Sequence, residues 1–323
     1  MKLLIINSNK RVPAHRLREH HVTQIKESFP EVEVEVVEED EVTPEQATNA
    51  DIFAGFPKFI PKLHEGMKVK WIHAFSAGVD SLLTPEVRVN NEIVITNSSG
   101  IHAIPIAEHI IGLIIAFNKK FPVLFRNQPA KVWERQDGVS ELHGKTVIVV
   151  GLGKIGSKVA TLLKAFDCKV HGVVRSMRER PEYVDKLLTL NTMHAALAQA
   201  DYVIICLPGN VETDSLFNVE LFEQMKESTV VVNIGRGSII NQEDLINALK
   251  NKVIGGALLD VTTPEPLPEE SPLWKMQNVI ITPHCSASNP YTTDRAVDRL
   301  CVNLKAFLKG EPMPNEVNKE LGY

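Results

Sequence analysis

The stretch VIVVGLGKIGSKVA, residues 147–160, contains the pattern that decides the fold. Gly151, Gly153 and Gly156 form GxGxxG directly after an apolar run and at the start of an amphipathic segment. In a strand–turn–helix unit the first glycine permits a tight turn, the second lets a pyrophosphate approach the backbone, and the third allows close packing. The helix N-terminus adds free N–H groups and a positive dipole end. The stretch predicts a dinucleotide site; the alternative interpretation is three glycines that serve only a tight turn.

Strand-like and helical segments alternate along the chain, which indicates βαβ units and doubly wound parallel sheets. The runs around the glycines are apolar without strict alternation, as is typical of parallel strands covered on both faces. Strands are therefore predicted over residues 2–7, 31–37, 51–56, 71–75, 92–96, 146–150, 169–174, 201–206, 229–234, 256–260 and 278–282. Helices are predicted over residues 104–117, 154–166 and 242–251, the last with Asn241 as its N-cap.

The composition narrows the class of protein. A chain of 323 residues predicts two domains, and an apolar content of 44% is that of an ordinary soluble globular protein. A net charge of −5 gives no reason to expect a nucleic-acid or membrane partner, and the apolar run 104–117 is too short to span a bilayer. The four cysteines show no metal-ligand spacing. We therefore expect a reduced, cytoplasmic protein without a metal site.

The stretch HGVVRSMR, residues 171–178, bears on the choice of cofactor. About 20 residues after such glycines, an acidic residue usually binds the ribose 2′-hydroxyl of NAD, whereas an arginine suits the 2′-phosphate of NADP. Here Arg175, Ser176 and Arg178 occupy that place, and no acidic residue ends the predicted strand. Arg175 can pair with a phosphate through two hydrogen bonds, and Ser176 can donate another. The stretch predicts an NADP(H) pocket; if these arginines are only solvated, the chain accepts NAD(H) without strong discrimination.

Charged residues gather at the ends of the later predicted strands. Arg236 lies between two glycines, and His284 follows a proline. Asp260 ends another strand, with Glu265 in the proline-rich loop after it. An arginine binds a carboxylate in fork geometry, a histidine exchanges a proton near neutral pH, and a carboxylate beside that histidine orients it. Each residue also has a structural interpretation as a turn cap or a solvated side chain, but their joint placement at strand ends favours one catalytic cleft.

The order of these motifs resembles a known family. GLGKIG, NIGRG, DVTTPEPLP and TPH follow one another, preceded by SAGVD at 76–80 and NSSGIHAIPIAEHIIGLIIA at 97–116. Over essentially the whole chain this is similar to the D-isomer-specific 2-hydroxyacid dehydrogenases. The resemblance implies an α/β protein of two doubly wound parallel-sheet domains, with a Rossmann cofactor domain, residues 101–287, inserted into a flavodoxin-like substrate domain, residues 1–100 and 288–323. It also implies a homodimer joined through the segment around 100–145.

The resemblance gives individual residues their expected roles. His284 would protonate the substrate carbonyl oxygen, Glu265 would keep His284 protonated and oriented, and Arg236 would bind the substrate carboxylate. The same carboxylate would be held by the backbone N–H groups of Ala77, Gly78 and Val79. Besides the glycines and the 175–178 stretch, cofactor contacts would come from Lys154, Ile155, Cys206, Leu207, Pro208, Thr213, Ile234, Gly235 and Asp260. Two departures from the family pattern, Thr262 and Gly209, do not touch this chemistry.

We therefore predict an NAD(P)-dependent oxidoreductase that reduces a small 2-oxo acid to the D-2-hydroxy acid. Glyoxylate and hydroxypyruvate are the leading substrates, with NADP(H) preferred and NAD(H) possible; longer 2-oxo acids stay open. The alternative is a nucleotide-sensing, corepressor-like binding protein, because that class shares the fold and resembles this chain even at the Arg, Glu and His positions. Turnover of NAD(P)H with a panel of 2-oxo acids separates the two hypotheses.

Overall fold

A computed structural model describes residues 1–8 and 16–322. The chain divides into two compact units, and the second is inserted into the first. The first unit comprises residues 1–102 and the residues from Ser288 on, and the second comprises Ala103–Ala287. No helix within residues 1–8 and 16–322 is long and apolar enough to cross a bilayer.

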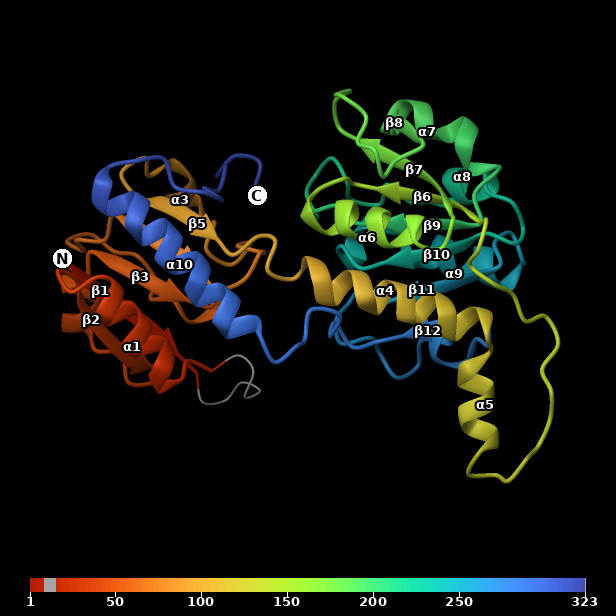
Figure 1. Cartoon of the computed structure of the whole chain (residues 1–323), viewed down its shortest axis with the longest axis horizontal. Coiled ribbons are helices and arrows are strands. Elements are labelled where there is room, and N and C mark those ends of the chain that lie inside the picture. The colour runs from red at the N-terminus through yellow and green to blue at the C-terminus, as the bar shows by residue number, and fades with distance from the viewer. Residues whose placement is uncertain (9–15, 323) are drawn as a thin grey trace. The chain divides into compact units, whose positions relative to one another are not determined.

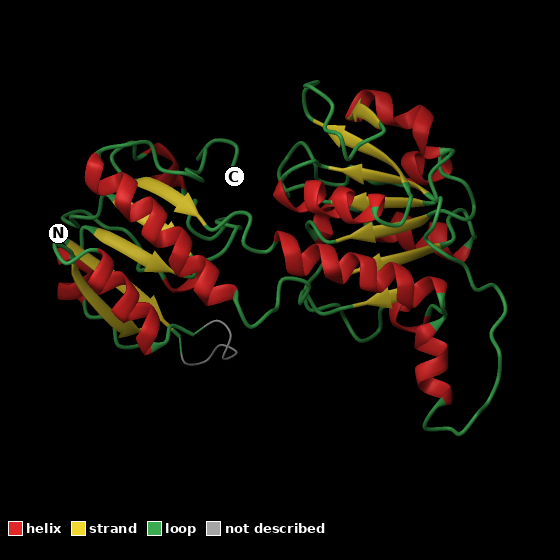
Figure 2. Cartoon of the chain, viewed as in Figure 1, coloured by secondary structure: helices red, strands yellow, loops and turns green. Residues whose placement is uncertain are grey.

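The first unit is built on a five-stranded parallel sheet (Figure 1). Its strand order, β2-β1-β3-β4-β5, is that of flavodoxin-like folds. The strands are β1 (Lys2–Asn7), β2 (Glu33–Glu38), β3 (Ile52–Gly55), β4 (Trp71–Ala74) and β5 (Val94–Asn97). Figure 2 shows helices on both sides of these strands, so both faces of the sheet are covered.

Alternate residues of each strand enter different cores in this first unit. Leu3, Ile5 and Trp71 point to the face covered by α1 (Glu19–Ser28) and α10 (Thr292–Lys309). Leu4, Phe53 and the other alternate residues point to the face covered by α2 (Pro44–Asn49) and α3 (Pro85–Val89). The sequence segments before and after the second unit therefore share one core.

The second unit contains a seven-stranded parallel sheet with the order β12-β11-β10-β9-β6-β7-β8. From β8 to β12 this is the 3-2-1-4-5-6 order of Rossmann folds with one more strand, and the order reverses between β6 and β9. The strands are β6 (Thr146–Val150), β7 (Lys169–Val174), β8 (Lys186–Thr189), β9 (Tyr202–Ile205), β10 (Val230–Asn233), β11 (Gly256–Leu259) and β12 (Val279–Ile281). The fold class predicted from the sequence is confirmed.

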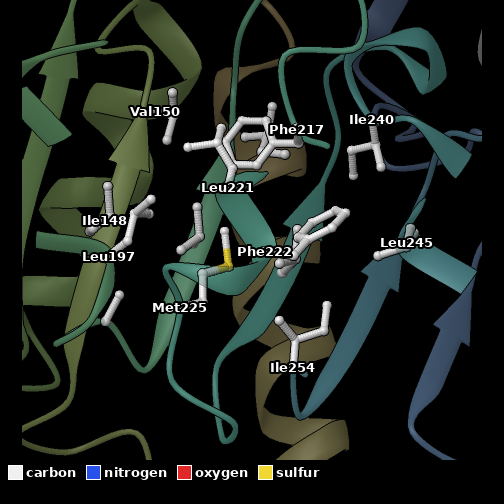
Figure 3. Packing of buried hydrophobic residues seen from close by; sticks show 14 of the residues in the cluster. Ile148, Val150, Leu197, Phe217, Leu221, Phe222, Met225, Ile240, Leu245 and Ile254 are labelled. Carbon is white, nitrogen blue, oxygen red and sulfur yellow. The ribbon is translucent and has the colours of Figure 1, made fainter. Parts of the chain in front are cut away.

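Two helical layers enclose this sheet. One face packs against α4 (Ala103–Asn118) and α6 (Lys154–Lys164). The other face packs against α7 (Leu190–Leu197), α8 (Val219–Glu223) and α9 (Gln242–Lys250). Asn241 is the N-cap of α9, as predicted. Figure 3 shows this second core, in which Phe217 and Phe222 lie between the strands and the helices. The short helix α5 (Phe121–Asn127) follows α4.

Most of the observed strands differ from the predicted ones by one or two residues at an end, and two of the differences have a structural reason. β2 begins at Glu33, because the N–H of Val32 donates to the carbonyl of Phe29 and residues before Glu33 form a turn after α1. The strand β8, Lys186–Thr189, is absent from the prediction. It is a four-residue strand at the edge of the sheet, next to β7, and its sequence, KLLT, has neither a long apolar run nor a clear alternation that would predict it.

Candidate active site

The glycine loop after β6 has one open position between two crowded ones. Gly151 has a φ of +100°, and a Cβ there would lie 2.8 Å from the carbonyl oxygen of Cys206. A Cβ at Gly156 would overlap the carbonyl oxygen of Gly151. Gly153, the N-cap of α6, would meet nothing within 4 Å. The space above Gly153 and the N-terminus of α6 therefore fits a pyrophosphate, with Lys154 and Ile155 in the first helical turn.

The charged residues noted in the sequence follow three neighbouring strands. Arg236 comes after β10, Asp260 directly after β11 and His284 after β12. These strands are parallel and adjacent, so their carboxyl ends lie at one edge of the sheet. That edge is where open α/β sheets bind ligands.

His284 and Glu265 form a hydrogen-bonded pair. Nδ1 of His284 lies 2.8 Å from Oε2 of Glu265, and both side chains are partly exposed. The other carboxylate oxygen of Glu265 accepts the N–H of Thr262 at 3.2 Å, which fixes the carboxylate within its own loop. Because Glu265 occupies Nδ1, the Nε2 atom of His284 is the one left to exchange a proton with a ligand.

Asp260 holds the backbone at His284 and at the two residues that follow it. The N–H of His284 donates to the carbonyl of Asp260 at 2.8 Å. The carboxylate of Asp260 accepts the N–H groups of Cys285 and Ser286 at 3.0 Å each. His284 has a φ of +49°, a conformation that costs energy in a residue with a side chain. Burial raises the pKa of Asp260, but hydrogen bonds from Ser286, Thr282 and Cys285 outweigh it and hold this pKa below its usual value.

Two further polar residues complete this arrangement, and sequence reasoning did not single them out. Oγ1 of Thr282 donates to Oδ1 of Asp260 at 2.6 Å. Nε2 of His109, on α4, lies 3.0 Å from the same Oγ1. Burial lowers the pKa of His109, although the nearby Asp260 acts to raise it. Because the hydroxyl proton of Thr282 is directed at Asp260, Nε2 of His109 is the donor in its bond to Oγ1. A threonine directly before the Pro–His pair was the available sequence signal.

The turn that carries Arg236 is fixed by a buried side chain. Asn233, at the end of β10, accepts the N–H of Gly235 at 3.0 Å and donates to the carbonyl of Arg236 at 2.9 Å. The stem of Arg236 passes close to Gly209, where a Cβ would lie 2.8 Å from Cγ of the arginine. The glycine that departs from the family pattern thus makes room for Arg236. A Cβ at Gly237 would overlap the carbonyl of Thr262, so this turn and the loop of Glu265 are in contact.

The predicted phosphate pocket contains an acidic side chain from elsewhere in the chain. Nη2 of Arg175, just after β7, lies 2.9 Å from Oε1 of Glu212, in the loop after β9. Ser176 is exposed, and Nη2 of Arg178 donates to the carbonyl of Leu152 in the glycine loop at 2.8 Å. The sequence around residues 171–178 gives no sign of Glu212, because only the fold brings the two loops together.

The other predicted cofactor residues line the loops after β9 and β10. Thr213 is buried, and its hydroxyl donates to the carbonyl of Pro208 at 2.8 Å. A Cβ at Gly235 would lie 2.5 Å from the carbonyl of Leu207, next to the buried Ile234, so these two loops touch. Burial raises the pKa of the Cys206 thiol to about 12, which keeps it protonated.

The predicted carboxylate-binding turn belongs to the other unit. Ala77, Gly78 and Val79 follow β4 in the first unit, whereas Arg236, Glu265 and His284 lie in the second. The hydroxyl of Ser76 donates to the carbonyl of Gly78 at 2.7 Å, and the side chain of Asn97 donates to the carbonyl of Ala77 at 2.9 Å. The turn is therefore held by side chains of its own unit.

One group of possible metal ligands occurs among the described residues, in the first unit, and consists of His20, His21 and Asp294. Nδ1 of His21 accepts the N–H of Arg18 at 3.0 Å, and its Nε2 lies 2.6 Å from Oδ1 of Asp294. A histidine that accepts at Nδ1 carries its proton on Nε2 and has no lone pair there for a metal. The hydrogen bonds of His21 therefore argue against a metal at this group.

The sequence profile of the D-isomer specific 2-hydroxyacid dehydrogenase NAD binding domain matches residues 111–286, more than half of the chain. The chain belongs to the D-isomer specific 2-hydroxyacid dehydrogenase family. This confirms the resemblance inferred from the motifs. A member of this family is an NAD(P)-dependent 2-hydroxyacid dehydrogenase, so the coarse prediction of an NAD(P)-dependent oxidoreductase holds as well.

Three related proteins show how far the similarity to this 2-hydroxyacid dehydrogenase extends. A glyoxylate reductase from Thermofilum pendens is 34% identical over 78% of this chain and 76% of its own length. The crystal structure of a D-isomer specific 2-hydroxyacid dehydrogenase family protein from Aeromonas salmonicida is 31% identical and matches with a TM-score of 0.86, covering 98% of this chain and 99% of that one. A D-isomer specific 2-hydroxyacid dehydrogenase from Xanthobacter autotrophicus, in complex with NADPH and MES, is 25% identical with a TM-score of 0.79 and covers 99% of both chains.

Proposed function

We propose that this dehydrogenase reduces a small 2-oxo acid to the D-2-hydroxy acid, with His284 as the acid and base. The observation that carries the proposal is the 2.8 Å pair of His284 and Glu265 in the loops after β11 and β12, beside the strand that leads to Arg236. A histidine oriented by a carboxylate, together with a guanidinium for the substrate carboxylate, is the set that carbonyl reduction of an oxo acid requires.

The chemistry divides between the cofactor and the residues of the chain. When bound, the reduced nicotinamide supplies a hydride to the carbonyl carbon. The Nε2–H of His284 gives its proton to the carbonyl oxygen, and Glu265, at Nδ1, stabilises and orients the protonated imidazole. Arg236 pairs with the substrate carboxylate and polarises the carbonyl. His284 then regains a proton from solvent, and in the oxidation direction it accepts the hydroxyl proton.

The substrate and its holding turn are part of the proposal. We assign the first unit to substrate binding through the backbone N–H groups of Ala77, Gly78 and Val79, and the second unit to the cofactor. Glyoxylate and hydroxypyruvate are the leading substrates. Support comes from the glyoxylate reductase of T. pendens and from the small residues of the 76–79 turn.

For the cofactor we propose NADP(H) in preference to NAD(H). Arg175 directly follows β7, where a 2′-phosphate is bound in NADP enzymes, and we assign Asp260, directly after β11, to the nicotinamide end of the cofactor. The X. autotrophicus relative was crystallised with NADPH. The open space over Gly153 is compatible with either nucleotide, because both contain the same pyrophosphate.

We also propose that the chain forms a homodimer through the segment around residues 100–145. Several large apolar side chains on and after α5 are exposed, which is costly on a monomer surface. Trp133 is fully exposed, Phe125 is 64% exposed and Val139 is 53% exposed. A second copy that covers this segment would bury them, and size-exclusion chromatography with light scattering measures the mass directly.

The decisive experiment follows the oxidation of NADPH and of NADH at 340 nm with glyoxylate and with hydroxypyruvate. Turnover with either acid and a preference for NADPH support the proposal. Equal use of both nucleotides would remove the NADP(H) preference and leave the reductase. Nucleotide binding without turnover on these and on longer 2-oxo acids would overturn the enzymatic role and favour a nucleotide-sensing protein.

A further inference from the structure

Arg175 is paired with a carboxylate where a cofactor's adenosine ribose would meet it. The guanidinium is 56% exposed and Glu212 is 64% exposed, so a ligand can reach both from solvent. The two residues come from different loops, after β7 and after β9, on the two strands that flank β6 in the sheet. The glycine loop follows β6, and Arg178 is hydrogen-bonded to its Leu152 carbonyl.

The loop that presents Glu212 is held in place by its neighbours. The backbone N–H of Glu212 donates to the side-chain oxygen of Asn210 at 2.9 Å, and the same oxygen accepts the N–H of Thr213 at 3.1 Å. The hydroxyl of Thr213 donates to the carbonyl of Pro208 at 2.8 Å. The backbone beside Glu212 is therefore ordered, and only its side chain needs to move to leave Arg175.

An arginine and a carboxylate at this point serve two different ligands. A ribose 2′-hydroxyl donates well to a carboxylate, and a 2′-phosphate pairs well with a guanidinium. The carboxylate also repels the phosphate and competes with it for Arg175. An exposed ion pair is weak, so a doubly charged phosphate can displace it.

We propose that Glu212 is a specificity-determining residue that makes the cofactor pocket accept both NADH and NADPH. It replaces, from a distant loop, the acidic residue that β7 lacks at its end. With NADH, Glu212 accepts the ribose 2′-hydroxyl while it stays paired with Arg175. With NADPH, the 2′-phosphate takes Arg175 and Glu212 turns to solvent. The inference rests on the proposed function, because it assumes that the nicotinamide nucleotide binds along the glycine loop.

The test measures equilibrium binding with and without the negative charge at residue 212. Quenching of protein fluorescence reports NADPH and NADH binding, and calorimetry reports 2′,5′-ADP and 5′-ADP, which lack the nicotinamide. In Glu212→Gln we expect NADPH and 2′,5′-ADP to bind about three- to tenfold more tightly, and NADH about two- to fivefold more weakly. The matched control is Asp214→Asn, which removes one charge from an exposed residue of the same loop.

The outcomes separate this inference from the proposed function. Unchanged affinities in Glu212→Gln, or equal changes in Asp214→Asn, would overturn the role of Glu212 while the enzyme stands. Wild-type protein that binds none of the four nucleotides would overturn both. Arg175→Ala gives a further check: combined with it, Glu212→Gln should no longer tighten 2′,5′-ADP, because the competition for the guanidinium is gone.

Discussion

The Nε2 atom of His109 lies 3.0 Å from Oγ1 of Thr282, two residues before His284. The Thr282 hydroxyl donates its hydrogen bond to Asp260, whose carboxylate accepts the N–H groups of the two residues that follow His284. His109, Thr282 and Asp260 thus form a chain of hydrogen bonds from α4 to the loop of the proposed acid, His284. Hydrogen bonds in such a chain polarise and strengthen one another. Their role is positioning, because none of these three side chains needs to touch the substrate carbonyl.

Replacing Thr282 tests this positioning. Thr282→Val keeps the shape but removes a donor to a buried carboxylate, so the free energy of unfolding should fall by about 1.5–3 kcal/mol. The rate constant kcat should fall about tenfold or more through misplacement of His284, with a smaller change in KM for the oxo acid. Thr282→Ser keeps the hydroxyl and should restore both values. A serine variant as slow as the valine variant would contradict the role of the hydrogen bond.

Removal of His284 should separate chemistry from binding. His284→Ala deletes the proton donor but none of the glycine loop, so kcat should fall by about 10²- to 10⁴-fold while the dissociation constant for NADPH changes little. Stopped-flow hydride transfer and fluorescence titration measure the two quantities. Loss of NADPH binding in this variant would show that His284 acts on the cofactor instead.

Two glycines of the same loop should respond in opposite ways to alanine. Gly153 has φ −79° and nothing within 4 Å of a Cβ, so Gly153→Ala should fold with an almost unchanged melting temperature. Its methyl group fills the space proposed for the pyrophosphate, and nucleotide affinity should fall about tenfold or more. Gly156→Ala would overlap Gly151 and should destabilise the fold by about 1–3 kcal/mol. Unchanged nucleotide affinity in the first variant would move the pyrophosphate elsewhere.

The charge of Asp260 should affect how the free energy of unfolding changes with pH in the acid range. Its pKa is lower in the folded protein than its usual value of 3.8, because the hydrogen bonds to its carboxylate outweigh its burial. The ionised form therefore contributes stability above pH 3.8, and this contribution is lost as the pH falls through the lowered folded value. Urea unfolding from pH 7 to pH 3 should show a gap between wild type and Asp260→Asn that is constant near neutrality and narrows in acid. A gap that stays constant down to pH 3 would contradict the assignment.

The sequence predicts local features well where they depend on neighbours along the chain. The glycines at 151, 153 and 156 have a pattern whose meaning depends only on the strand before and the helix after them. Arg236, Glu265 and His284 could be grouped because parallel strands place their carboxyl ends together. The pairing of Arg175 with Glu212 could not be predicted, since the two lie in loops whose contact depends on the strand order. His109 sat on an apolar helix face, where a histidine usually fills a core.

The insertion of one unit into the other affects how the chain folds. Trp71, on β4, packs against Phe307 of α10, with ring centroids 5.1 Å apart, and Leu3 and Ile5 share that core. During synthesis the five strands of the first unit emerge before the second unit, together with α1, but α10, which covers the rest of the same sheet face, emerges after it. The second unit is contiguous, so it can fold while α10 is still missing from that face. These long-range contacts make the first unit the slower folder of the two and leave part of its apolar sheet open to aggregation until α10 packs on it.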